Sequence, residues 1–206
     1  MNIEEINYPA QNTHGINFEI KITDCPKLIE LKKGFGSVSN IFNLESLKTV
    51  DLTTCEYINS NSFFKCPNLE EIIGWGDHEL DVGEHLFQLC PKININTWTD
   101  KIVSSATEIL INTAIKEMHI TGLNSDLPSF FNCRKLKKVI YALDIRLESL
   151  NGMSFLYCES LEEVVLPTRV NEIGERAFEG TKISSFDTTG KIFRLNSFNH
   201  SLIKEL

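Results

Sequence analysis

The chain has 206 residues, of which 42% are hydrophobic and 23% charged, and its formal net charge at pH 7 is −8. This acidic balance argues against a nucleic-acid partner, because proteins that bind nucleic acids usually carry a basic stripe. No apolar stretch approaches the roughly 20 residues that a membrane-spanning helix needs, so membrane insertion is not expected.

The start of the chain, residues 1–6, lacks the basic residues and the apolar run of a secretory signal. The sequence as it stands therefore predicts a cytoplasmic location.

A short sequence motif begins here and recurs to the end of the chain. It reads L-x-x-[IV], and in most copies an aromatic residue or isoleucine precedes it, followed by a gap that often holds a cysteine. The clearest copies lie at 63–72, 130–139 and 155–164.

The first leucine-type residue of each motif serves as an anchor, and successive anchors are 19–25 residues apart. The anchors are Ile3, Leu28, Leu47, Leu69, Ile93, Ile115, Leu136, Leu161, Ile183 and Ile203. This period is typical of leucine-rich repeats, in which each repeat forms one coil of a solenoid. Neither half of such a coil buries its apolar face alone, so stacked neighbours must share one continuous core.

Each anchor is expected to begin a short strand. Apolar and mostly polar residues alternate over Leu161–Leu166, which indicates a strand with one buried face. Pro167 then ends the strand, because proline cannot extend the interior of a paired strand. The stretch Ile173–Phe178 is expected to return along the opposite wall as a turn of helix or 3₁₀-helix. In the middle of the chain Ile93–Trp98 fits the strand template badly, so a distorted coil is expected there.

Two stretches match a known repeat closely. Val170–Phe178 follows I-x-x-I-G-x-x-A-F, and Phe155–Pro167 follows F-x-x-C-x-x-L-x-x-[IV]-x-[IL]-P. The chain thereby resembles the BspA-like branch of leucine-rich-repeat proteins. The fold implied is an α/β solenoid of about nine to ten coils forming a single domain over 1–206. Short parallel strands would line its concave face, and irregular, short helical or 3₁₀ turns its convex face.

Five cysteines occupy the same repeat position, three residues after the aromatic column: Cys25, Cys66, Cys90, Cys133 and Cys158. Equivalent residues of stacked strands lie about 4.7–4.9 Å apart with parallel Cβ vectors, whereas disulfides need Cβ atoms about 3.5–4.5 Å apart. The column therefore predicts buried free thiols. Cys55 lies off the column and is expected to be the exposed thiol.

The aromatic column itself, including Phe130, Phe155 and Phe178, is expected in the core. Its sequence neighbours Phe64 and Phe131 are expected to be exposed. The tryptophans Trp75 and Trp98 fit two interpretations, as core filling or as exposed aromatic anchors of an interface.

No catalytic or metal-binding constellation is recognisable, so an enzyme, a cofactor and a metal are not expected. Asp77-His78 and Glu84-His85 come closest to a metal cluster, but their spacing fits no standard zinc site. Cys133 and Cys158 are explained by the repeat, which makes a catalytic thiol unnecessary. Gly74–Gly76 lacks the lysine and hydroxyl residue of a phosphate-binding loop.

The second and third residues of each strand should point away from the core and align along one open face. The candidate binding residues at these positions are Lys48, Thr49, Glu70, Glu71, Lys116, Glu117, Lys137, Lys138, Glu162 and Glu163. One interpretation is a solvated surface kept soluble by mixed charge. The other is a concave recognition face for a protein partner, as is usual for solenoids.

Two functions remain open. The absent signal and the free cysteines favour an intracellular, non-enzymatic interaction scaffold. The family resemblance instead implies a cell-surface adhesin or antigen of a bacterium or parasite that binds host matrix proteins. Both chain ends, 3–9 and 203–206, read as repeat strands without a capping segment. They predict either end-to-end self-association or a longer array, because an uncapped coil exposes apolar core.

Overall fold

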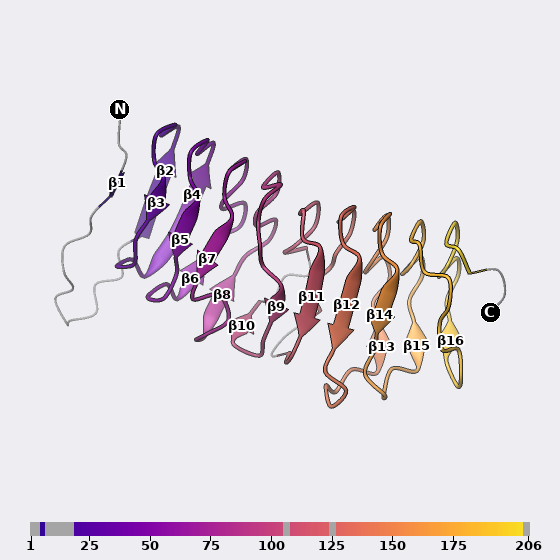
Figure 1. Ribbon diagram of the computed structural model, residues 1–206. Coiled ribbons are helices and arrows are strands. Elements are labelled where there is room, and N and C mark those ends of the chain that lie inside the picture. The colour runs from indigo at the N-terminus through magenta and orange to yellow at the C-terminus, as the bar shows by residue number, and fades with distance from the viewer. Residues whose placement is uncertain (1–4, 7–18, 105–107, 124–126, 204–206) are drawn as a thin grey trace.

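The computed structural model describes residues 5–6, 19–104, 108–123 and 127–203. They form an elongated stack of about eight turns, which Figure 1 shows from the indigo N-terminal coils to the yellow C-terminal ones. Every pairing between the strands of this stack is parallel. The expectation of nine to ten coils is therefore not confirmed. The strand residues expected at 3–4 and 204–206 lie outside the described part.

The strands that follow the repeat anchors lie on one side of the stack, here called the front wall (Figure 1). They form two four-stranded sheets. The first contains β1 (Glu5–Ile6), β3 (Glu30–Leu31), β5 (Thr49–Asp51) and β7 (Glu71–Ile73). The second contains β9 (Thr97–Trp98), β11 (Glu117–Ile120), β12 (Lys138–Tyr141) and β14 (Glu163–Val165).

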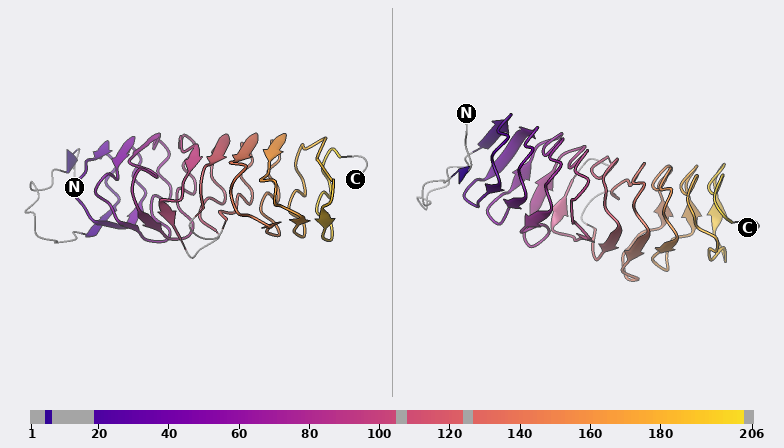
Figure 2. Two further views of the ribbon diagram at one scale, coloured as in Figure 1. Left: turned by 90° about the horizontal axis from the view of Figure 1, so that it is seen from below. Right: turned by 45° about the horizontal axis from the view of Figure 1, so that its top comes forward.

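The opposite side, here called the back wall, carries further short strands rather than helices, as both views in Figure 2 show. One sheet contains β2 (Glu19–Thr23), β4 (Ser37–Phe42), β6 (Tyr57–Ile58), β8 (Leu80–Val82) and β10 (Ile102–Val103). The other contains β13 (Ser149–Leu150), β15 (Glu172–Ile173) and β16 (Ile192–Phe193). The described residues contain no helical segment, so the predicted helical or 3₁₀ turns are not found.

The physical reason lies in the segment between each back strand and the next front strand, here called the turn wall. Arg176, inside the stretch predicted as helical, has a φ of 56°. A right-handed helix cannot pass through a residue in the left-handed region. Other coils place non-glycine residues there at intervals of two or four: Asn61, Phe63 and Lys65; His85, Phe87 and Leu89; Met153 and Tyr157; Asn196 and His200.

Hydrogen bonds between coils of the turn wall run mostly in one direction. Alternate N–H groups at 153–157 donate to carbonyls at 175–179, each over 2.9 Å. The N–H groups at 176–180 donate in turn to carbonyls at 195–199, over 2.7–3.1 Å. Earlier coils repeat this direction, although the Phe87 N–H donates backwards to the Ser62 carbonyl. Because the left-handed residues break helical hydrogen bonding, these N–H groups donate to the neighbouring coil instead.

Between the walls lies one hydrophobic core. The aromatic column is confirmed as part of it. Phe155 stacks between Phe130 and Phe178, with ring centroids 5.4 and 5.3 Å apart, and all three side chains are buried. Phe64 and Phe131, expected to be exposed, are half-buried instead. For Phe131 the cover includes Tyr157, whose ring centroid lies 6.1 Å away.

All six cysteines are free and buried, as predicted for the five in the column. The expectation for Cys55 is wrong, because its side chain has no exposed area. Cys55 follows β5 and turns inward, where its thiol lies 3.3 Å from the Tyr57 carbonyl oxygen. The His78 ring covers the same turn, with Nε2 2.7 Å from the Cys55 carbonyl oxygen.

Candidate functional site

The strands of the front wall bring the predicted binding residues into two rows of exposed or half-exposed side chains. Strand register aligns Thr49 with Glu71, and Lys138 with both Glu117 and Glu163. The neighbouring row is joined through its backbone: Glu70 N–H to Lys48 carbonyl, Lys137 N–H to Lys116 carbonyl, and Glu162 N–H to Lys137 carbonyl. The alignment expected from the repeat is therefore present, although an interruption separates the first four residues from the other six.

Some charges in these rows are already paired. Lys138 Nζ lies 2.9 Å from a Glu163 carboxylate oxygen, and this contact raises the pKa of Lys138. Glu117 lies 2.8 Å from His119 Nε2 within its own strand. Such exposed pairs contribute little to stability, because water and salt screen them. Lys116 and Lys137 have no acidic partner among the described residues, so their charges are available to a ligand.

The front wall is interrupted between β7 and β9, which do not pair. The cause lies in two residues of the intervening segment, at which the order of buried and exposed side chains is reversed. Ile95 is buried and Asn96 exposed, whereas the aligned positions in β11, Glu117 and Met118, are exposed and buried. Because side chains alternate between the faces of a strand, this segment cannot continue the sheet in register. The distorted coil expected at 93–98 is thus confirmed.

Among the described residues, a single backbone–backbone hydrogen bond joins the segment to the front residues of the preceding coil, from the Asn94 N–H to the Glu70 carbonyl at 3.0 Å. Below this bond, no described backbone group of the segment forms a hydrogen bond with the backbone of Ile72. The Ile72 side chain is half-buried, whereas Val50 and Val139, which occupy the same position in their strands, are fully buried. The Trp75 indole closes the lower end by donating to the Thr97 carbonyl over 3.1 Å.

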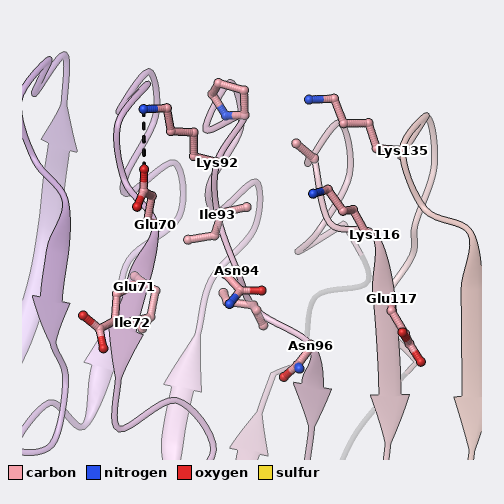
Figure 3. Close-up of a pocket in the computed structure, with 13 residues that line it drawn as sticks. Glu70, Glu71, Ile72, Lys92, Ile93, Asn94, Asn96, Lys116, Glu117 and Lys135 are labelled. Atoms are coloured by element: carbon pink, nitrogen blue, oxygen red, sulfur yellow. Dashed lines mark ion pairs between the residues drawn. The ribbon is translucent and has the colours of Figure 1, made fainter.

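The interruption opens a hollow of about 900 Å³ on the front wall, shown in Figure 3. One side is formed by Glu70, Glu71 and Ile72, and the base by residues 93–96. The other side is formed by Ala114, Lys116, Glu117 and Lys135, and the rim by Pro91 and Lys92. The hollow therefore combines a base that exposes the amide side chains of Asn94 and Asn96 with a charged border.

Four polar lining residues were missed by the sequence prediction: Lys92, Asn94, Asn96 and Lys135. Lys92 and Lys135 directly precede the anchors Ile93 and Leu136, outside the two outward positions that the repeat defines. The poor fit of 93–98 to the repeat was the signal that could have found them. A coil that breaks the pattern marks the place where the wall changes shape.

The tryptophans fit the core-filling interpretation, with one addition. Trp98 is fully buried, and Trp75 is half-buried. Trp75 packs edge-on against Trp98 and Phe87, with ring centroids 6.1 and 5.6 Å away. Together with its hydrogen bond to the Thr97 carbonyl, this packing makes Trp75 a bridge across the interruption rather than a free interface anchor.

The two histidines near the acidic residues make local contacts. His78 contacts the Cys55 carbonyl, as described above, and His85 Nε2 lies 3.4 Å from Glu108. Over the described ranges, no three His, Cys, Asp or Glu side chains come together in a way that could hold a metal ion. The same residues contain no helix with the length and apolar character needed to cross a membrane.

Comparisons with known proteins agree on the fold. The model of the BspA-type leucine-rich repeat region matches residues 29–137 and 127–204. The crystal structure of a leucine-rich repeat protein from T. pallidum is similar, with a TM-score of 0.50 and 18% identity, over 84% of this chain and 73% of that one.

A leucine-rich repeat protein from Bacteroides ovatus has a TM-score of 0.46 and 23% identity, and the match covers 84% of this chain and 47% of that one. This chain thus spans about half of its length. No curated protein matches the chain. Because the family model covers most of the sequence, the chain belongs to the BspA-type leucine-rich repeat family.

Proposed function

We propose that the chain is a non-enzymatic interaction scaffold whose front wall binds a protein partner at the hollow between β7 and β9. The observation that carries this proposal is the interruption of the front wall. It replaces regular sheet with a recess of about 900 Å³ bordered by exposed charged side chains.

The chemistry of the recess suits a polypeptide. Half-buried Ile72 offers apolar contact at one side, the base offers the amide groups of Asn94 and Asn96, and the border offers charged groups. Ile72 also has backbone groups without a partner from the segment's side within the described residues. Protein interfaces combine hydrogen-bonding and charged groups of this kind with some apolar contact. A small apolar ligand would need a more enclosed and more apolar pocket.

Site-specific photo-crosslinking tests the proposal. A photoreactive amino acid replaces Glu71 or Lys137 on the front wall, and in a control variant it replaces Asp81, an exposed residue of the back strand β8. We expect the two front positions to capture the same protein from lysate and the back position not to capture it. Equal capture from Asp81, or capture from Asp81 alone, would contradict the front wall as the binding face.

A further inference from the structure

Resting on the proposed function, we propose that the hollow selects an acidic segment of its protein partner, whose carboxylates contact Lys116 and Lys135. These two lysines lie on the same side of the hollow, and Figure 3 shows both side chains extending into it toward the segment that carries Asn94.

The argument begins with the carboxylates of the hollow, each of which already has a local contact. Glu70 lies 3.5 Å from Lys92 Nζ, and a Glu71 oxygen accepts a hydrogen bond from the Thr49 hydroxyl over 3.4 Å. Glu117 is paired with His119, as described above. A basic segment would have to compete with these contacts to reach the carboxylates.

The three lysines of the hollow differ in whether they already have a partner. Lys92 is held by Glu70 and also donates to the Asn68 side-chain oxygen over 2.7 Å. Lys116 and Lys135 make neither an ion pair nor a side-chain hydrogen bond with any described residue, and both are exposed. The border of the hollow carries three carboxylates and three lysines, and among the described residues Lys116 and Lys135 are the lysines of this border that have no partner. The exposed side chain of Asn94 likewise has no hydrogen bond to a described group and can donate to an anionic oxygen.

The spacing of the two lysines fits an extended peptide. Lys116 aligns with Lys137 through the bond from the Lys137 N–H to the Lys116 carbonyl, and Lys135 precedes Lys137 by two residues. Adjacent strands lie about 4.8 Å apart and two residues span at most about 6.6 Å, so the two Cα atoms are at most about 8 Å apart, since Lys135 lies in a turn. Carboxylates on alternate residues of an extended segment are about 6.6 Å apart, a difference that flexible lysine side chains can accommodate.

The whole-chain charge of −8 makes this local arrangement decisive. An acidic segment is repelled at long range, so it must gain its affinity from short-range contacts in the hollow. Binding should therefore depend on the particular lysines that face the hollow, not on the number of positive charges elsewhere on the surface.

Fluorescence anisotropy with defined peptides tests this inference on the purified chain. The probes are three labelled decapeptides of alternating sequence: Glu-Thr, Gln-Thr and Lys-Thr. We expect the Glu-Thr peptide to bind best, and Lys116→Gln/Lys135→Gln to weaken that binding roughly tenfold. The matched control, Lys27→Gln/Lys101→Gln, removes the same charge from exposed sites elsewhere and should leave binding unchanged.

The outcomes separate this inference from the proposed function. If the Glu-Thr peptide fails to bind up to about 1 mM, or binds equally to both double variants, the acidic selectivity is wrong. Preferential binding of the Gln-Thr or Lys-Thr peptide would also overturn it. In each of these cases the scaffold function stands as long as crosslinking from Glu71 and Lys137 still captures one partner and crosslinking from Asp81 does not.

Discussion

Single residues of the turn wall adopt backbone conformations that their side chains do not favour. Phe63 and Phe87 have φ values of 60° and 57°, although the left-handed region is unusual for bulky residues. Such a conformation costs roughly 1–3 kcal/mol and persists only where its surroundings impose it. Here the two rings stack with centroids 5.4 Å apart, and both are fully buried. Core packing thus overrides local preference at these positions.

The aromatic column should dominate stability. Phe155→Ala would remove a ring that stacks on both neighbours and leave a cavity, so we expect a loss of about 3–5 kcal/mol in unfolding free energy. Phe130→Ala and Phe178→Ala should cost similar amounts. Half-buried Phe131 serves as the control, and Phe131→Ala should cost less. Urea titration measures each value, and equal losses for Phe130→Ala and Phe131→Ala would contradict the assignment of the column.

The buried thiols should make the free energy of unfolding fall as the pH rises through the alkaline range. Burial raises the pKa of Cys55 and of Cys133 to about 11. Unfolding returns each thiol to its ordinary value near 8.5, so the unfolded chain loses these protons first as the pH rises. Their stabilising contribution is present below pH about 8.5 and is lost as the pH rises through about 11. We expect the urea midpoint to fall over this window, and to fall less in Cys133→Ala.

The same burial predicts the outcome of thiol titration. With all six cysteines buried, none should react rapidly with a thiol reagent in the native chain, and all six should react after denaturation. One fast group would indicate that the turn around Cys55 opens. Fewer than six groups after denaturation under non-reducing conditions would instead reveal disulfides.

Among the elements, the segment at 93–98 sets the shape of the front wall. Its neighbours β7 and β11 follow the repeat, and each pairs with a strand on its far side. The segment departs from the repeat at two residues only, Ile95 and Asn96, and this local exchange separates two four-stranded sheets. A small change in the order of side chains is therefore enough to produce the candidate site.

Amide hydrogen exchange should detect the interruption directly. Ile72 lacks a described hydrogen-bond partner on the side of the segment, whereas Val139 lies within a strand that is paired on both sides. We expect the Ile72 amide to exchange faster than the Val139 amide, because unprotected backbone groups open more readily. Equal protection at both positions would show that the front wall is continuous in solution.

A double variant tests the cause. Ile95→Glu/Asn96→Met restores the order of side chains found in β11, so it should let the segment pair with β7 and slow exchange at Ile72. The same variant should fill the hollow and abolish crosslinking from Glu71. If Ile72 remains fast, the exchange of Ile95 and Asn96 is not what separates the sheets.

Some elements of the structure could be predicted from the sequence and others could not. The repeat predicted the front strands, the aromatic column and the distorted coil, because burial requires the same residue types at each turn. It did not predict the conformation of the turn wall. Ile173–Phe178 was expected to be helical, yet its backbone is fixed by bonds to the next coil, and such contacts carry no local sequence signal. For the same reason the repeat defined the outward rows but missed Lys92 and Lys135, which only the interruption brings into a site.

At the scale of the whole molecule, the interruptions of the two walls are staggered. The front sheet breaks between β7 and β9, while the back sheet continues from β2 through β10. The back wall in turn changes sheet between β10 and β13, where the front sheet from β9 to β14 is continuous. Each break is therefore spanned by an intact sheet on the opposite wall, and one core runs beneath both.

This arrangement predicts a single cooperative unfolding transition. Tryptophan fluorescence reports the coils around Trp75 and Trp98, whereas far-ultraviolet circular dichroism reports all the strands. Because neighbouring coils share the core, we expect the two urea curves to coincide, and Phe178→Ala to shift both equally. An earlier fluorescence transition would indicate that the stack separates at the hollow.

End-to-end association stays a prediction. On the last described coil the large apolar side chains Ile192, Leu195 and Leu202 are 57%, 69% and 57% exposed. We expect the apparent mass from light scattering to rise with protein concentration, and Leu195→Lys to reduce the rise. A constant monomer mass would contradict this expectation.

The hydrogen bonds between coils of the turn wall, most of which run in one direction, give this wall an electrical polarity. In ordinary sheets neighbouring peptide dipoles largely cancel, but here amide hydrogens point toward the higher-numbered coils and carbonyl oxygens toward the lower-numbered ones. Aligned peptide dipoles add, as they do along a helix. The turn wall thus carries aligned peptide dipoles along the stack without containing a helix in the described residues. A coil turned end for end would set carbonyl against carbonyl, so the backbone alone fixes the direction in which coils can follow one another.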